Sequence, residues 1–193
     1  MKVLVACEFS GVVRDAFIAR GHNAISCDLL ATEVPGPHHQ GDVSEIIGDG
    51  WDLMVAHPPC TYLAGSGLHW NKRRPERAAL TEEALEFVRL LLDAPVPRIA
   101  LENPVGCIST RIRKPDQIIH PWQFGHDASK ATCLWLKGLP LLEATDVLPG
   151  GRGARRANQT ASGQNKLSPS KDRWKLRSLT YPGIAEAMAS QWD

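Results

Sequence analysis

The sequence lacks the features that define several classes of protein. Its five cysteines are scattered and form no Cys-x-x-Cys pair, which argues against a disulfide scaffold and favours the reducing cytoplasm. No apolar run approaches the roughly 20 residues of a membrane-spanning helix, and the early charge at Lys2 argues against a signal peptide. His120, His126 and Cys133 are spaced too irregularly to predict a metal site. We therefore expect a cytoplasmic protein with no metal and no membrane contact.

An excess of charge is also lacking, and so are the glycine-rich phosphate motifs. The formal net charge of +1 argues against a uniformly basic coat for nucleic acid but allows a local basic patch. The chain has no Gly-x-Gly-x-x-Gly sequence for a dinucleotide and no Gly-x-x-x-x-Gly-Lys-Ser/Thr loop for a nucleoside triphosphate. Neither kind of phosphate-bearing cofactor is therefore indicated.

What is present is an ordinary soluble composition, arranged as alternating strands and helices. Of the 193 residues, 43% are hydrophobic and 22% are charged, which suits one domain over 1–193. Short apolar runs predict strands, and helical periodicity predicts helices. We expect strands over 2–7, 23–27, 53–56, 98–101 and 131–136, and helices over 12–20, 44–47, 81–92 and 184–192.

The first strand, the turn after it, the next helix and the second strand form a βαβ unit typical of a mononucleotide site. The turn Glu8-Phe9-Ser10-Gly11 would bring a ligand to a helix amino terminus, and Asp28 would accept hydrogen bonds from a ribose diol. The alternative is that Gly11 only makes the turn and Asp28 is only a solvated carboxylate. Asp42 is a second candidate cofactor acid, although capping the short helix after it is the default interpretation.

The chain is organised around a buried strand that ends at two prolines and presents a thiol. Leu53–Ala56 is followed by His57 and Pro58-Pro59, and then by Cys60. A residue at the carboxyl end of a parallel strand lies where open α/β sheets bind ligands. We therefore predict that Cys60 is a nucleophile and His57 a hydrogen-bonded structural residue, while the other four cysteines are small buried hydrophobes.

A second polar cluster, Glu102-Asn103-Pro104, follows the strand over 98–101 and reaches the same sheet edge. A thiolate that attacks an electron-poor carbon, next to an acid that protonates the attacked ring, can activate carbon 5 of a pyrimidine.

Two further segments are candidates for substrate contact. The stretch over 61–80 shows no clear periodicity and predicts a lid loop beside Cys60, while Thr81 should cap the helix that follows. The segment over 150–178 has one acid and eight basic residues, which favours either flexibility or binding to a polyanion. The basic residues are Arg152, Arg155, Arg156, Lys166, Lys171, Arg173, Lys175 and Arg177.

These motifs occur in the order found in the DNA cytosine-5 methyltransferases, which the chain resembles from end to end. Pro58-Pro59-Cys60 and Glu102-Asn103-Pro104 resemble that family's Pro-Pro-Cys and Glu-Asn-Val motifs, and the turn over 8–11 resembles its Phe-x-Gly-x-Gly turn. Gly41-Asp42-Val43 resembles its adenine-contacting segment, and the strand over 130–136 takes the place of its Gln-x-Arg-x-Arg strand. The chain is most similar to the small stand-alone forms carried by phages and prophages.

The resemblance implies an α/β, Rossmann-like methyltransferase fold, with a mostly parallel sheet and helices on both faces, and S-adenosylmethionine as cofactor. It implies that Cys60 is the nucleophile, Glu102 the acid and Asn103 the residue that orients the loop. The implied cofactor contacts are Glu8, Phe9, Ser10, Gly11, Asp28, Asp42 and Pro58. The implied contacts to substrate or nucleic acid are Pro59, Gly67, Lys130, Thr132, Arg152, Arg155 and Arg156.

The chain departs from this family in its glycine-poor cofactor turn, its missing Gln-x-Arg-x-Arg arginines and its lack of a large target-recognition domain. The partner is expected to be DNA, duplex or single-stranded, and the alternative is a free cytidine nucleotide. A non-catalytic nucleic-acid-binding module and an amino-directed methyltransferase are also compatible with the motifs. The sequence does not decide between a monomer and a homodimer.

Overall fold

The apolar runs near the amino terminus form the centre of one seven-stranded sheet in the computed structural model, which describes residues 1–193. The strands are β1 (Lys2–Ala6), β2 (Asn23–Asp28), β3 (His38–Gln40), β4 (Leu53–Ala56), β5 (Arg98–Pro104), β6 (Gln117–Ile119) and β7 (Thr132–Lys137). Their order in the sheet is β3-β2-β1-β4-β5-β7-β6. The first five are parallel, and β7 runs antiparallel to both β5 and β6.

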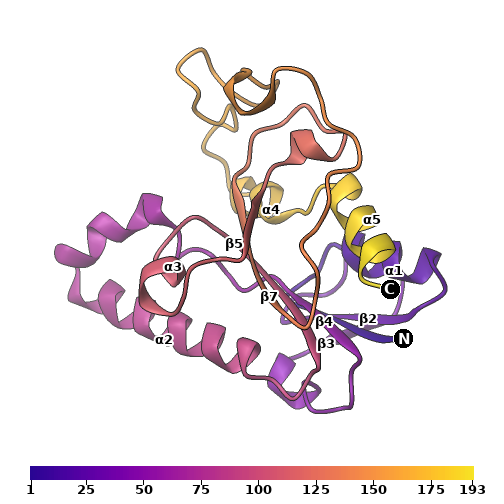
Figure 1. Ribbon diagram of the computed structural model, residues 1–193. Coiled ribbons are helices and arrows are strands. Elements are labelled where there is room, and N and C mark those ends of the chain that lie inside the picture. The colour runs from indigo at the N-terminus through magenta and orange to yellow at the C-terminus, as the bar shows by residue number, and fades with distance from the viewer.

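Helices cover both faces of this sheet (Figure 1). The α-helices are α1 (Val12–Ala19), α2 (Pro75–Leu92), α3 (Ile108–Arg111), α4 (Arg173–Ser178) and α5 (Pro182–Gln191). The 3-10 helices are η1 (Val43–Glu45), η2 (Gly65–Lys72), η3 (Pro121–Gln123) and η4 (Gly151–Gly153). Helices α1 and α5 pack on one face and α2 packs on the other. The predicted Rossmann-like α/β fold is therefore confirmed, and no helix is both long and apolar enough to cross a membrane.

Alternating side chains of the central strands supply both halves of the core. Val3 and Val55 are fully buried with α1 and α5, whereas Leu4 and Met54 are fully buried with α2. A strand that is buried on both faces must be apolar at every position, which explains the unbroken hydrophobic runs of β1 and β4.

The chain leaves β1 in one direction to form β2 and β3, and it returns to form β4 and β5 on the other side of β1. Such a reversal of strand order opens a crevice at the carboxyl ends of the central strands. The turn after β1 and the turn after β4 meet there, because the amide of His57 donates to the carbonyl of Ala6 at 2.9 Å.

The structure corrects three local expectations. The expected loop over 61–80 contains η2 and the start of α2, which begins at Pro75 because proline suits the first turn of a helix. Thr81 therefore lies inside α2, where its buried hydroxyl donates to the carbonyl of Tyr62, and does not cap the helix. The segment over 150–178 includes α4.

A pair of backbone contacts attaches the chain after Cys60 to the chain after β5. Gly65 donates to the carbonyl of Val105 at 3.0 Å, and Cys107 donates to that of Leu63 at 2.9 Å. Gly106 lies between them, so close that an added Cβ atom would stand 2.0 Å from the Leu63 carbonyl oxygen. Only glycine fits this position without moving the segment that carries the thiol.

We predict that Gly106→Ala lowers the free energy of unfolding by about 1–3 kcal/mol, the usual cost of overpacking. Urea denaturation followed by circular dichroism measures this change. Gly48→Ala is the matched control, since an added Cβ there meets nothing within 4 Å. Equal stability of the two variants would show that the close approach at Gly106 imposes no constraint.

Candidate active site

The turn after β4 presents Cys60 at the surface. Pro58 is buried, whereas Pro59 and Cys60 are exposed. Proline cannot donate to a sheet ladder, so the two prolines end the strand and turn the chain outward. The amides of Leu63 and Ala64 both donate to the Cys60 carbonyl, at 3.1 and 2.9 Å, which fixes the turn beyond the thiol.

Two side-chain hydrogen bonds attach this turn to the end of β5. Nδ1 of His57 lies 2.7 Å from Oε2 of Glu102, and Nδ2 of Asn103 donates to the Pro58 carbonyl at 2.7 Å. These bonds continue the register of the last paired residues, Ala56 and Leu101. Glu102 and Asn103 are therefore brought to the turn after β4, where Asn103 holds the backbone next to the prolines.

Glu102 is buried and lies between charged and polar neighbours. Its Oε1 is 3.9 Å from Nζ of Lys130, and its Oε2 contacts His57. Burial raises the pKa of Glu102, but Lys130, His57 and the Thr132 hydroxyl outweigh it and lower the pKa to about 2. Glu102 is therefore a carboxylate at neutral pH in the free protein, and it needs a proton before it can act as an acid.

The charges around Cys60 oppose one another. Although Cys60 is exposed, the protein atoms around its thiol partly desolvate it and raise its pKa. Lys130 and Arg177 lower this pKa and Glu102 raises it, with a net rise. Lys130 belongs to the segment before β7, and Arg177 belongs to α4. Lys130 and Thr132, which the resemblance implied as substrate contacts, thus lie beside Glu102.

A pocket opens next to Glu102 between β7 and the carboxyl-terminal helix. It is lined by Glu102, Lys130, Thr132, Thr180, Tyr181, Ile184 and Met188. Lys130 also donates to the Leu179 carbonyl at 3.4 Å, so the chain between α4 and α5 forms part of the wall.

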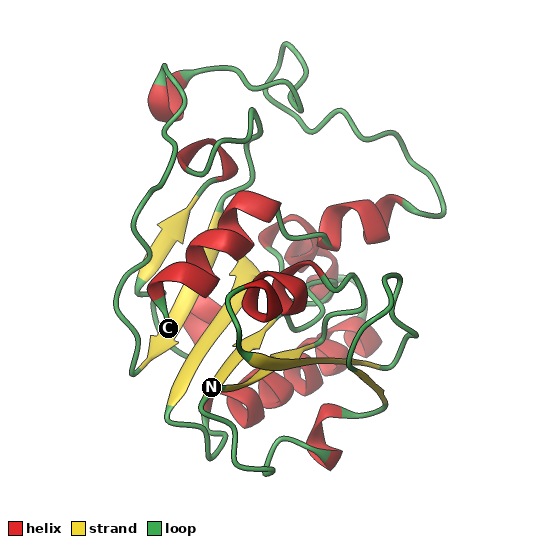
Figure 2. Cartoon of the chain, turned by 90° about the vertical axis from the view of Figure 1, so that its right-hand side faces the viewer, coloured by secondary structure: helices red, strands yellow, loops and turns green.

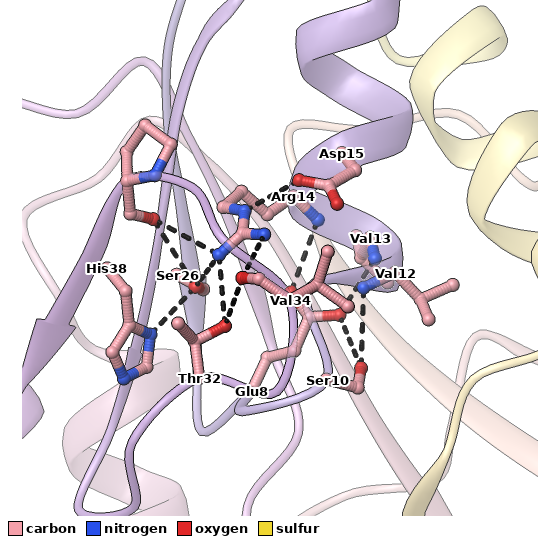
Figure 3. A network of polar contacts seen from close by, with 11 residues as sticks. Glu8, Ser10, Val12, Val13, Arg14, Asp15, Ser26, Thr32, Val34 and His38 are labelled. Carbon is pink, nitrogen blue, oxygen red and sulfur yellow. Dashed lines mark hydrogen bonds and ion pairs between the residues drawn. The ribbon is translucent and has the colours of Figure 1, made fainter.

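The turn after β1 is shaped by Glu8, which caps α1 (Figure 3). Its Oε1 accepts from the amide of Val13 at 2.7 Å and from the Ser10 hydroxyl at 3.2 Å, and its Oε2 accepts from the amide of Arg14 at 3.2 Å. Gly11 closes the turn with a φ of 76°, a value that suits glycine. A carboxylate of the chain itself therefore occupies the anion-binding end of α1, and Glu8 shapes the turn after β1.

Arg14 connects this turn to the loop after β2, an arrangement that Figure 3 shows and that the sequence did not reveal. The guanidinium is fully buried and donates to the hydroxyls of Ser26 and Thr32, each at 3.2 Å, and to the Val34 carbonyl at 3.1 Å. An added Cβ on Gly36 would stand 2.6 Å from this group. The only local signal was an arginine beside the apolar positions of a short helix.

The end of β2 offers a carboxylate beside exposed apolar side chains. Asp28 accepts from the amide of Leu30 at 2.9 Å, and burial raises the pKa of Asp28 despite this bond and the charge of His38. Leu29 and Leu30 are 71% and 45% exposed, so an apolar surface lies next to a carboxylate that is short of hydration. Asp42 caps η1 through the amide of Ser44 at 2.8 Å, as the default interpretation expected.

Helix α4 reaches over the turn after β1. The ring of Trp174 packs against Phe9 with centroids 5.9 Å apart, and Lys175 lies 5.8 Å from the Phe9 centroid and pairs with Glu33. The same helix carries Arg177, which acts on Cys60. Nothing in the local sequence could have predicted these contacts, because they join segments about 165 residues apart.

The residues expected to contact nucleic acid are divided among several surfaces. Gly67 lies in η2, where its carbonyl accepts from Nε of Arg77 at 3.3 Å. Arg152 and Arg155 are exposed in and after η4. Arg156 is instead buried, stacks over Trp122 and donates to the Gly151 carbonyl at 2.8 Å, so it holds the loop together and does not face a phosphate.

We predict that Lys130→Met and Arg177→Met each shift the alkylation of Cys60 by iodoacetamide to higher pH. Removing a cation destabilises the thiolate relative to the neutral thiol, so the pKa of Cys60 rises and a higher pH is needed to reach the same rate. The rate is measured across pH by mass spectrometry of the peptide that contains Cys60.

Lys114→Met removes an exposed charge that does not act on Cys60, and it should leave the profile unchanged. If all three variants give the wild-type profile, the two cations do not influence the thiol.

No protein-family model and no curated protein matches this chain. Among solved structures, it resembles a crystal structure of a candidate DNA modification methyltransferase encoded within an Escherichia coli prophage. The two chains are 17% identical, with a TM-score of 0.48, and the likeness covers 77% of this chain and 52% of the other. The chain thus spans about half the length of the protein that it resembles.

Proposed function

We propose that the protein transfers a methyl group from S-adenosylmethionine to carbon 5 of cytosine in DNA, through a covalent adduct with Cys60. One observation carries this proposal. An exposed thiol and a buried carboxylate leave adjacent parallel strands and are tied together by the bonds of His57 and Asn103. A pyrimidine ring in that crevice would have sulfur on one side and the carboxylate at its edge.

The cofactor crevice suits a cationic nucleoside better than a phosphorylated one. Phosphates commonly bind the free amides of a helix amino terminus, but Glu8 already occupies those of α1 and would repel a second anion. Burial, then Asp28, Cys27 and Asp42, raise the pKa of the Cys7 thiol, so the crevice disfavours negative charge. A sulfonium nucleoside carries a positive centre and no phosphate, and it fits both features.

The chain's own groups would divide the binding of this cofactor among them. Asp28 would accept hydrogen bonds from the ribose hydroxyls. Leu29 would cover one part of the apolar face of adenine, and Phe9 would cover the rest of that face. Asp42, beyond its capping role, lies on the adenine side of the crevice in this proposal, and Pro58 closes the crevice toward the base. When bound, S-adenosylmethionine supplies an electrophilic methyl group.

Cys60 begins the reaction on the base. Its thiolate forms a bond to carbon 6, which moves electron density to carbon 5 and makes that carbon nucleophilic. Ring nitrogen 3 becomes basic in this step and takes a proton from Glu102. After methylation, solvent water takes the proton from carbon 5, the carbon–sulfur bond breaks to release the Cys60 thiolate, and ring nitrogen 3 returns its proton to Glu102, which restores the ring.

Glu102 must gain a proton when the base binds, because its pKa of about 2 makes it a carboxylate beforehand. A ring nitrogen lone pair that faces a carboxylate oxygen is repelled unless a proton lies between them, so base binding itself favours proton uptake. Lys130 and Arg177 stabilise the Cys60 thiolate while this happens.

The central test is a trapping assay with a mixed pool of duplex and single-stranded DNA containing 5-fluorocytosine. Fluorine cannot leave carbon 5 as a proton does, so the methylated adduct should persist as a denaturation-resistant complex that depends on S-adenosylmethionine. Cys60→Ser should give no complex, and Glu102→Gln should form it far more slowly.

Binding of S-adenosylmethionine is checked by calorimetry on the same preparation. A protein that binds the cofactor and yet forms no adduct through Cys60 with any of these substrates would contradict the proposed mechanism.

A second candidate substrate is a free cytidine nucleotide, favoured by the burial of Arg156, which leaves the expected basic segment with fewer available cations. Activity on DNA through exposed cations should fall steeply as salt rises, whereas activity on deoxycytidylate should not.

We predict that Arg152→Ala combined with Arg155→Ala reduces the salt slope on DNA by about 2, one unit for each phosphate contact.

Methyl transfer to DNA and to deoxycytidylate is measured in parallel over a salt series. Arg20→Ala is the control, because Arg20 is exposed at the far end of α1. Salt-independent activity on deoxycytidylate together with none on DNA would establish the free nucleotide as the substrate.

A further inference from the structure

His57 makes a buried contact that the reaction described above does not use. Its side chain and that of Glu102 are 10% and 9% exposed, and Nδ1 of His57 lies 2.7 Å from Oε2 of Glu102. His57 leaves β4 one residue after Ala56, and Glu102 follows Leu101, the partner of Ala56 in β5. The contact is therefore fixed by the sheet itself.

The carboxylate of Glu102 decides which ring nitrogen of His57 carries a proton. An ionised carboxylate has no hydrogen to donate, and Glu102 is ionised in the free protein. At a distance of 2.7 Å, Nδ1 of His57 is therefore the donor and Oε2 of Glu102 the acceptor. The other ring nitrogen, Nε2, is buried and has no hydrogen-bond partner, so His57 makes no side-chain hydrogen bond except the one to Glu102.

We propose that His57 is a positioning residue for Glu102, which it holds by a permanent hydrogen bond to Oε2 so that Oε1 alone is presented to ring nitrogen 3 of the base. Lys130 lies 3.9 Å from Oε1, and Glu102, Lys130 and Thr132 line the same pocket. The proton given to the base comes from Oε1, and the proton on Nδ1 of His57 does not move during the reaction.

Without this bond, the carboxylate could rotate and offer either oxygen to the base. Oriented by His57, it meets the ring in one geometry, and an orientation set in advance lowers the barrier of a chemical step more than it strengthens substrate binding. This inference rests on the proposed function only for its kinetic consequence. The hydrogen bond and the proton on Nδ1 can be measured on the free protein.

Two substitutions with different geometry test the role. In His57→Asn, the side-chain amide nitrogen is the same number of bonds from Cβ as Nδ1, so it can donate to Glu102 but cannot titrate. In His57→Gln, the amide nitrogen takes the place of Nε2 and the donor to Glu102 is lost.

We expect His57→Gln and His57→Ala to lower kcat by roughly 10- to 100-fold, as loss of an orienting partner typically does, with little change in KM. His57→Asn should retain most of the wild-type kcat and the wild-type pH profile. If His57→Asn is as impaired as His57→Ala, His57 acts through its own proton and the positioning role is wrong. Circular dichroism of each variant establishes that it is folded.

Nitrogen-15 spectra of histidine-labelled free protein give a readout that does not depend on methyl transfer. The His57 signals, assigned by their loss in His57→Asn, should report a proton on Nδ1, and Glu102→Gln should change the Nδ1 signal. An Nδ1 that carries no proton at neutral pH would overturn the inference. If Nδ1 carries its proton as expected but no adduct forms with 5-fluorocytosine, the proposed function fails and the orientation of Glu102 by His57 stands.

Discussion

The parallel pairing of β4 with β5 is the constraint on which the site depends. The pairing ends at Ala56 and Leu101, and the next two residues of each chain segment are joined by side-chain hydrogen bonds. His57 contacts Glu102, and Asn103 donates to the Pro58 carbonyl. A thiol on a loop would otherwise have no fixed relation to a carboxylate more than 40 residues away in the chain. Here the sheet fixes the position of the turn that carries the thiol relative to the carboxylate, because the register of β4 and β5 sets which residues meet beyond the last backbone hydrogen bond.

The carboxylate of Glu8 shapes the crevice beside this pair, because it lies at the amino terminus of α1, where other α/β folds often bind a phosphate. Glu8 satisfies the free amides of α1, and Arg14 holds the loop after β2 against the same helix (Figure 3). Both are buried groups with several partners, so the turn is rigid without the usual glycines. The turn is therefore held by side-chain hydrogen bonds, with Gly11 as its one glycine.

The carboxyl-terminal part of the chain completes the site from the opposite side. Figure 2 shows it crossing above the edge of the sheet before it returns through α4 and α5. Trp174 and Lys175 contact the turn after β1, Arg177 acts on Cys60, and Lys130 is tied to the Leu179 carbonyl. The segment over 150–178, whose composition favoured either flexibility or binding to a polyanion, thus connects the two halves of the candidate site.

Local sequence patterns were sufficient to predict the strands, the strand ends and the fold class, which depend on residues close together in the chain. The apolar run of β4, the prolines that end it and the acid that ends β2 identified the sheet, its carboxyl edge and the fold class, because burial and backbone geometry are encoded residue by residue. They also predicted that Cys60 and Glu102 would reach one edge, since parallel strands end together. The start of α2 was missed although Pro75 signals it, because the basic residues before it obscured the helical period.

Only the tertiary structure decided how those groups are used. That Glu8 caps a helix, that Arg156 is buried and that Lys130 faces Glu102 all depend on contacts between segments far apart in the chain. The charge state of Glu102 is the clearest case, because the sequence shows a carboxylic acid and its neighbours in space make it a carboxylate. Protonation and orientation are set by the local field and by packing, and no single stretch of sequence contains either.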